Sequence, residues 1–209
     1  MKKIVSLFVF LLIPLMAYSA DYTEGKQYTR VNDQASSKPE IREYFSFYCP
    51  HCFRFEPFME GVKKQLPEGV TFELNHVDFL RAASPQIQQL LSKGVVIAQQ
   101  LGMEKEMTAA IFNYIQVQRA VISSEKDLRN IFVLNGADGE KFDKLMKSFS
   151  VNSKAKQMKK NQDYFVKKRA LTGVPTIIVN GQYRINNAEL DKKNFEQDYH
   201  KLIKHLLSL

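Results

Sequence analysis

Tryptophan is absent from the 209-residue chain, and cysteine occurs only twice. Two cysteines are too few for the sets of four that hold many structural zinc ions, and the four histidines show no ligand spacing that could complete such a site. A disulfide framework is also unnecessary, because 44% of the residues are hydrophobic and a chain of this length can bury a core. The composition therefore indicates one large globular domain, or one domain with another inserted into it.

Beyond its first residues, the chain has no hydrophobic run of the roughly 20 residues that a membrane-spanning helix needs. The apolar stretch from Ile4 to Met16 is shorter than that and follows Lys2 and Lys3. A basic start, an apolar core and then Ala17-Tyr18-Ser19 are typical of a secretory signal peptide with its cleavage site. We therefore expect residues 1–19 to be a cleaved signal peptide; a membrane anchor is the alternative.

The two cysteines stand together in the motif Cys49-Pro50-His51-Cys52, between a strand-like run over 41–48 and a helical pattern. Pro50 suits the first position of a helix, so Cys49 would lie at the helix N-terminus, where free N–H groups and the helix dipole favour a thiolate. His51 can add a donor or a positive charge. A disulfide that closes so short a loop adds little stability. The pair therefore predicts a redox dithiol, in which Cys52 closes the disulfide behind Cys49.

Hydrophobic periodicity predicts strands at both ends of the chain and helices in the middle. Strands are expected over 26–31, 41–48 and 70–76, and Pro57 and Gly61 predict a kink or a short helix after the cysteines. Asn180-Gly181 predicts a hairpin between strands 176–179 and 182–185, ahead of a closing helix. Between these parts, helices are expected over 84–101, 103–115, 124–135, 140–149 and 153–171. This order indicates a small mixed sheet interrupted by an all-helical domain.

Several motifs together resemble the DsbA family of bacterial periplasmic thiol oxidases. They are Asp21–Tyr28, Glu43–Cys52 with Pro50-His51 between the cysteines, Leu66–Gly69, His76-Val77, Gly173–Thr176 and Val179–Tyr183. The resemblance implies an α/β chain with a thioredoxin fold and an inserted all-helical domain. Residues 20–80 and 172–209 would form the thioredoxin-like domain, and residues 81–171 the helical domain.

The resemblance also implies roles for residues. Cys49 would be the nucleophile and Cys52 the resolving cysteine. Val174-Pro175 would be a cis peptide facing them, where an extended substrate can pair as an added strand. The implied function is a periplasmic dithiol oxidase that gives its Cys49–Cys52 disulfide to newly exported proteins, without a metal or another cofactor. A DsbB-type inner-membrane oxidase would re-oxidise it, with Phe55 as the candidate for the docking groove, and we expect a monomer.

The chain departs from the family pattern in two places. Glu43 matches a buried acid of the family and is a candidate for tuning the site, but Leu74 occupies the strand position where its lysine partner is expected. An acid without its cation should be harder to ionise in an apolar site. In the second hairpin strand, Asn187 follows Asn186 where the family tends to have proline. The resemblance therefore supports the docking of a partner less directly than it supports catalysis.

Other interpretations of the same residues stay open at this point. The chain could be an isomerase or reductase of the same fold, or a non-catalytic, chaperone-like binding module with incidental cysteines. Glu43 could face solvent, and Phe55 could be plain core; His76 we interpret as a core histidine, like the methionines 103, 107 and 158. The seven basic residues within 154–169 could suggest nucleic acid, but we interpret them as the solvated face of a helix.

Overall fold

The computed structural model describes residues 22–209, so the predicted signal peptide lies outside the described residues. In this part of the chain five strands form one mixed sheet in the order β1-β5-β4-β2-β3. The strands are β1 (Tyr28–Arg30), β2 (Glu40–Phe45), β3 (Thr71–His76), β4 (Thr176–Val179) and β5 (Tyr183–Ile185). β2 pairs in parallel with β3 and antiparallel with β4. The strand that leads to the cysteines therefore lies inside the sheet.

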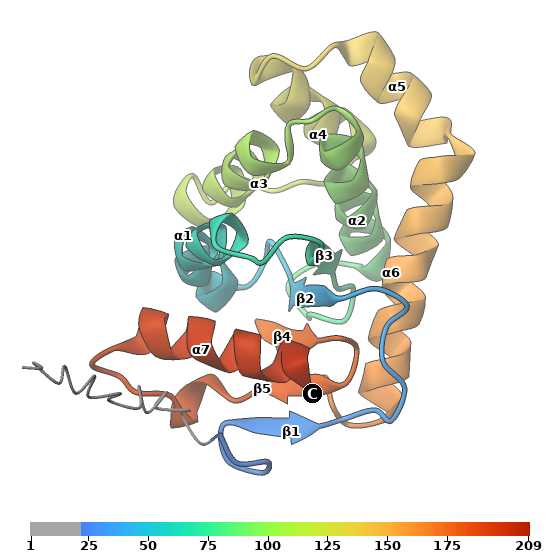
Figure 1. Cartoon of the computed structure of the whole chain (residues 1–209). Helices are drawn as coiled ribbons and strands as arrows, with labels where there is room; N and C mark the ends of the chain where they lie inside the picture. Colours follow the sequence, from blue (N-terminus) through green and yellow to red (C-terminus); the bar gives the residue numbers. More distant parts are fainter. Residues whose placement is uncertain (1–21) are drawn as a thin grey trace, which may run out of the picture.

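Helices surround this sheet (Figure 1). Two of them, α1 (Pro50–Lys64) and α7 (Phe195–Ser208), pack on one face. Five others lie between β3 and β4 in the chain: α2 (Pro85–Gln100), α3 (Glu104–Phe112), α4 (Glu125–Leu134), α5 (Gly139–Lys147) and α6 (Phe149–Lys167). Figure 1 shows α2 to α5 grouped beside the sheet and the long α6 returning along it towards β4. The predicted thioredoxin fold with a helical insertion is confirmed. Within residues 22–209, no helix has the length and apolar character required to cross a bilayer.

The core continues from the sheet into the helical insertion. Side chains along β2 alternate between the two faces, so Ile41 packs with α1 and α7 while Tyr44 packs against Phe165 at the end of α6. At the carboxyl end of the same strand, Phe45 and both cysteines belong to a third buried cluster, shared with Phe112 of α3. The insertion is therefore packed onto the end of the sheet that carries the cysteines.

The main differences between the predicted elements and the structure concern three of them. β2 ends at Phe45 rather than residue 48, because the chain turns there and the carbonyl of Ser46 accepts a hydrogen bond from the Cys49 N–H at 3.0 Å. α6 begins at Phe149 rather than residue 153, because the Ser148 hydroxyl caps it. α1 continues through Pro57 to Lys64, so of the two expectations, a kink or a short helix, the short helix is wrong. Buried Met59 and Val62 hold the second half of α1 on the sheet.

The contact between α4 and α5 tests how specific the packing of the insertion is. Phe142 is 0% exposed with its ring centroid 4.9 Å from that of Phe132, whereas Phe149 is 86% exposed. Phe142→Ala should lower the free energy of unfolding by about 3–5 kcal/mol, because burial is lost and a cavity is left. Phe149→Ala should change it by less than about 0.5 kcal/mol. Urea unfolding followed by circular dichroism measures both, and equal effects would contradict this assignment of the core.

Candidate redox site

Cys49 is the N-cap residue of α1, with Pro50 at the first helical position. Its sulfur accepts a hydrogen bond from the Cys52 N–H at 3.2 Å, as the side chain of a capping serine does. The first turn of α1 holds no acidic residue and its last turn holds Lys63 and Lys64. No carboxylate in this first turn therefore opposes the positive end of the helix dipole at the Cys49 sulfur. The start of α1 stabilises a negative charge there.

The two cysteines are free thiols whose pKa values shift in opposite directions. Hydrogen bonding from the Cys52 side chain is the main cause that lowers the pKa of Cys49 to about 6; N–H groups and the charge of His51 also lower it, and burial opposes them. Burial is the main cause that raises the pKa of Cys52, and Cys49 adds to the rise. Cys49 is 6% exposed and Cys52 0%. Near neutral pH, the pair therefore combines a thiolate at Cys49 with a protonated, inaccessible thiol at Cys52.

The loop before β4 lies against the Cys49 sulfur. When Cys49 is protonated, its thiol donates a hydrogen bond to the carbonyl of Val174 at 3.4 Å, and the Val174-Pro175 peptide bond is cis. Both residues are half-buried. The fold thus brings together the two segments that the sequence motifs singled out, with backbone of the Val174 loop directly beside the reactive sulfur.

His51 is exposed at the start of α1, and its Nδ1 lies 3.2 Å from Nη2 of Arg54. Because a guanidinium group can only donate, Nδ1 is the acceptor in this contact. Arg54 brings a permanent positive charge to the exposed side of the dithiol, and no sequence signal pointed to it. Among residues 22–209, no three His, Cys, Asp or Glu side chains gather as a metal site would require.

The backbone of Phe47, two residues before Cys49, is held at both its N–H and its carbonyl. Its N–H donates to Nε2 of His76 at 3.3 Å, and its carbonyl accepts from the side-chain amide of Gln116 at 2.7 Å. Burial lowers the pKa of His76 to about 3, so the ring is neutral and is a core histidine, as predicted. Gln116 lies in η1 (Asn113–Val117), a π-helical continuation of α3 that periodicity does not reveal. The helical insertion therefore contributes directly to positioning the cysteine loop.

Glu43 lies in the middle of β2, directly opposite Leu74, and is 4% exposed, so it does not face solvent. Burial is the main cause that raises its pKa to about 8. Lys63 of α1 opposes this rise, but its ammonium group also pairs with Glu60 at 2.6 Å and Glu104 at 3.0 Å. The expectation that the acid would be hard to ionise agrees with this raised pKa. Lys63, which is shared with two other carboxylates, therefore compensates the charge of Glu43 only in part. It does not fully take the place of the strand lysine that the family pattern has where this chain has Leu74.

Phe55 and Asn187 are the two residues that the sequence connected with the partner groove. Phe55 is half-buried, with its ring centroid 5.0 Å from Phe58 and 6.3 Å from Tyr199, which are contacts of the core between α1 and α7. Asn187 begins η2 (Asn187–Glu189); its neighbour Asn186 bonds the carbonyl of Lys26 at 3.0 Å. A role of either residue in partner docking stays a prediction.

The dithiol keeps its proton on the buried sulfur and its negative charge on the sulfur at a helix N-terminus, and it lies at the end of a thioredoxin-type sheet. This combination defines the class of protein. The chain is a thiol:disulfide oxidoreductase.

Comparison with known proteins narrows the class. Residues 40–199 match the DSBA-like thioredoxin domain. The DsbA thiol:disulfide interchange protein of Escherichia coli K12 is 35% identical to this chain, over 99% of this chain and 98% of its own length. That of Haemophilus influenzae is 36% identical, over 99% of both. The structure of Proteus mirabilis DsbA with a non-covalently bound peptide superposes with a TM-score of 0.79 at 31% identity, covering 91% of this chain and 100% of that one. The chain belongs to the DsbA family.

The opposite pKa shifts predict how the reduced protein titrates. Ultraviolet thiolate absorbance should rise with a midpoint near pH 6, at which Cys49 ionises. Cys52→Ala should move this midpoint upward, because the Cys52 side chain is the main cause of the low pKa. Cys49→Ala should remove the transition. A transition that persists in Cys49→Ala would show that the low pKa belongs to Cys52 instead.

Burial of Glu43 predicts a pH-dependent stability. Between its ordinary pKa of 4.5 and about 8, the unfolded state ionises this carboxyl while the folded state keeps it protonated. Stability that Glu43 provides below the lower value is therefore lost as the pH rises through this window. Glu43→Gln should remove the loss, so the oxidised variant should gain several kcal/mol over wild type towards pH 8, with little difference near pH 4. Urea unfolding at a series of pH values measures this gain, and parallel pH profiles would contradict the raised pKa.

Proposed function

We propose that this chain is a dithiol oxidase that gives its Cys49–Cys52 disulfide to reduced proteins exported to the periplasm. Its membership of the DsbA family supports the activity. The observation that carries the direction of the reaction is the lowered pKa of Cys49. Because a stabilised thiolate exists only after the disulfide is reduced, it favours the reduced form of the protein, and the equilibrium then favours oxidation of the substrate.

The reaction proceeds by two exchanges at sulfur. A substrate thiolate attacks the Cys49 sulfur, the Cys49–Cys52 bond breaks, and the released Cys52 sulfur takes up a proton. This leaves a mixed disulfide between Cys49 and the substrate. A second substrate thiolate attacks the substrate sulfur of that bond and displaces Cys49 as a thiolate, which is a good leaving group because its pKa is low. The substrate loses two electrons and gains a disulfide, and this protein gains both electrons.

Substrate is held at the loop beside the sulfur. The backbone at Val174 and Pro175 lies next to Cys49, where an extended peptide can add as a strand. The peptide bound to the Proteus mirabilis protein supports a peptide segment as the ligand. Arg54 supplies positive charge at the exposed side of the dithiol and donates a hydrogen bond to His51. The hydrogen bonds from Phe47 to His76 and from Gln116 to Phe47 keep the loop in place.

The remaining parts of the proposal concern the setting of the reaction. The protein acts as a monomer in the periplasm after removal of residues 1–19, and a DsbB-type inner-membrane oxidase restores the disulfide. It uses no cofactor besides the disulfide itself. Residues 81–171 act as a helical domain inserted between residues 20–80 and 172–209, and they cover the cysteine end of the sheet.

The equilibrium with glutathione tests the proposed direction. Wild type is placed in buffers of graded glutathione redox ratio, free thiols are alkylated, and the mass gives the fraction reduced. The pair should stay reduced until the buffer becomes strongly oxidising, because the Cys49 thiolate stabilises the reduced form. A pair that is oxidised even in mostly reduced glutathione would indicate a reductase of the same fold.

Replacement of the nucleophile tests whether the cysteines act at all. Cys49→Ala should abolish the oxidation of a reduced test protein, whereas Phe149→Ala, on the exposed surface, should retain the activity of wild type. Full activity of Cys49→Ala would favour a chaperone-like binding module.

A further inference from the structure

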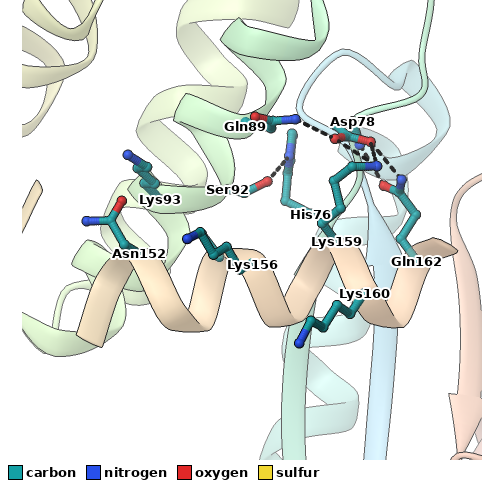
Figure 2. Close-up of a pocket in the computed structure, with 11 residues that line it drawn as sticks. His76, Asp78, Gln89, Ser92, Lys93, Asn152, Lys156, Lys159, Lys160 and Gln162 are labelled. Atoms are coloured by element: carbon teal, nitrogen blue, oxygen red, sulfur yellow. Dashed lines mark hydrogen bonds and ion pairs between the residues drawn. The ribbon is translucent and has the colours of Figure 1, made fainter. Parts of the chain in front are cut away.

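A cavity of about 410 Å³ lies between α2 and α6, and neither cysteine lines it (Figure 2). Buried His76 and Ser92 form part of its wall. Lys93 comes from α2, and Lys156, Lys159 and Lys160 come from α6. These four lysines include members of the basic run that the sequence suggested was a solvated helix face. In the structure Lys156 and Lys160 are exposed, as that prediction implies, and together with half-buried Lys93 and Lys159 they line a concavity between the two helices.

The cavity has an excess of positive charge. Asp78 is its one carboxylate, and its oxygens are occupied by the amide groups of Gln162 at 2.7 Å and Gln89 at 3.0 Å and by Lys159 at 3.5 Å. Lys159 also pairs with Asp163 at 2.9 Å. Within the described part of the chain, the other three lysines of the cavity form no ion pair. The neighbouring His76 ring is neutral and does not change this balance.

The placement of these lysines favours a bound anion. Figure 2 shows Lys93 and Lys156 on opposite walls of the cavity, while Lys159 turns towards Asp78. Like charges around a concave space repel one another, and the low-dielectric walls concentrate their field inside it. An anion between α2 and α6 would relieve this repulsion and bridge the two helices.

We propose that this cavity binds a phosphate group, either of a small phosphate monoester or of a lipid headgroup. Lysine ammonium groups are compact point charges suited to a multiply charged, tetrahedral anion. No arginine lines the described cavity, so lysine ammonium groups alone supply its positive charge. A phosphate dianion would balance two lysines, whereas a single carboxylate would balance one. The volume lies at the small end of ligand sites, which begin at about 300 Å³.

Calorimetric titration of the oxidised full-length mature protein with glycerol 3-phosphate tests the site. The double variant Lys93→Gln/Lys156→Gln should bind at least about tenfold more weakly than wild type, equivalent to ~1.4 kcal/mol. Lys167→Gln/Lys201→Gln is the matched control, because it also removes two positive charges, both from exposed positions of α6 and α7 outside the cavity. The control should stay within about twofold of wild type, since distant surface charges are screened by salt. Circular dichroism checks that each variant is folded.

A second arm separates the two sources of phosphate. Vesicles that contain phosphatidic acid, whose headgroup is a phosphate monoester, are compared with vesicles of phosphatidylcholine in a sedimentation assay, with the same variants. Binding of glycerol 3-phosphate that depends on the two lysines supports a soluble ligand. Lysine-dependent binding to phosphatidic acid alone supports a lipid headgroup. The proposal is overturned if neither probe binds, if Lys93→Gln/Lys156→Gln binds as wild type does, if the control variant weakens binding as much as that variant, or if citrate binds as tightly as glycerol 3-phosphate.

Discussion

The difference in pKa between two neighbouring sulfurs is the constraint on which the rest of the structure depends. Cys52 keeps its proton because it is fully buried, and Cys49 gives its proton up because the first turn of α1 and the Cys52 side chain donate hydrogen bonds to it. This difference requires Cys49 to be the N-cap residue and Cys52 to lie one turn further along. Two residues between the cysteines are the spacing that satisfies both conditions.

Keeping Cys49 at that position requires a rigid loop between β2 and α1. Hydrogen bonds to the peptide unit of Phe47 come from β3 through His76 and from the helical insertion through Gln116. His76 can accept from Phe47 because its other nitrogen donates to Ser92, whose hydroxyl bonds the carbonyl of Gln88. A neutral ring is essential to this chain of bonds, and its complete burial keeps it neutral. The insertion thus holds the loop as well as covering it.

Local signals in the sequence were sufficient for much of this arrangement. The cysteine motif, the Asn180-Gly181 hairpin and the helix starts expected at residues 84 and 124 each depend on a few adjacent residues, and all are found where they were expected. Lys63 and Gln116 could not be found in this way, because their roles depend on which helix packs near which strand. The basic run of α6 shows the same limit: its spacing fits a solvated face, and only the fold places Lys93 of α2 opposite it.

Leu74 has a further consequence for the dithiol. Without a cation on β3, Glu43 is protonated near neutral pH and adds no negative charge beneath the sulfurs. The interaction between two ionisable groups is reciprocal, so the Cys49 thiolate, which raises the pKa of Glu43, is in turn opposed by an ionised Glu43. Above about pH 8 that carboxylate forms and raises the pKa of Cys52 further. The thiolate on Cys49 is therefore least opposed between the pKa of Cys49, about 6, and that of Glu43, about 8.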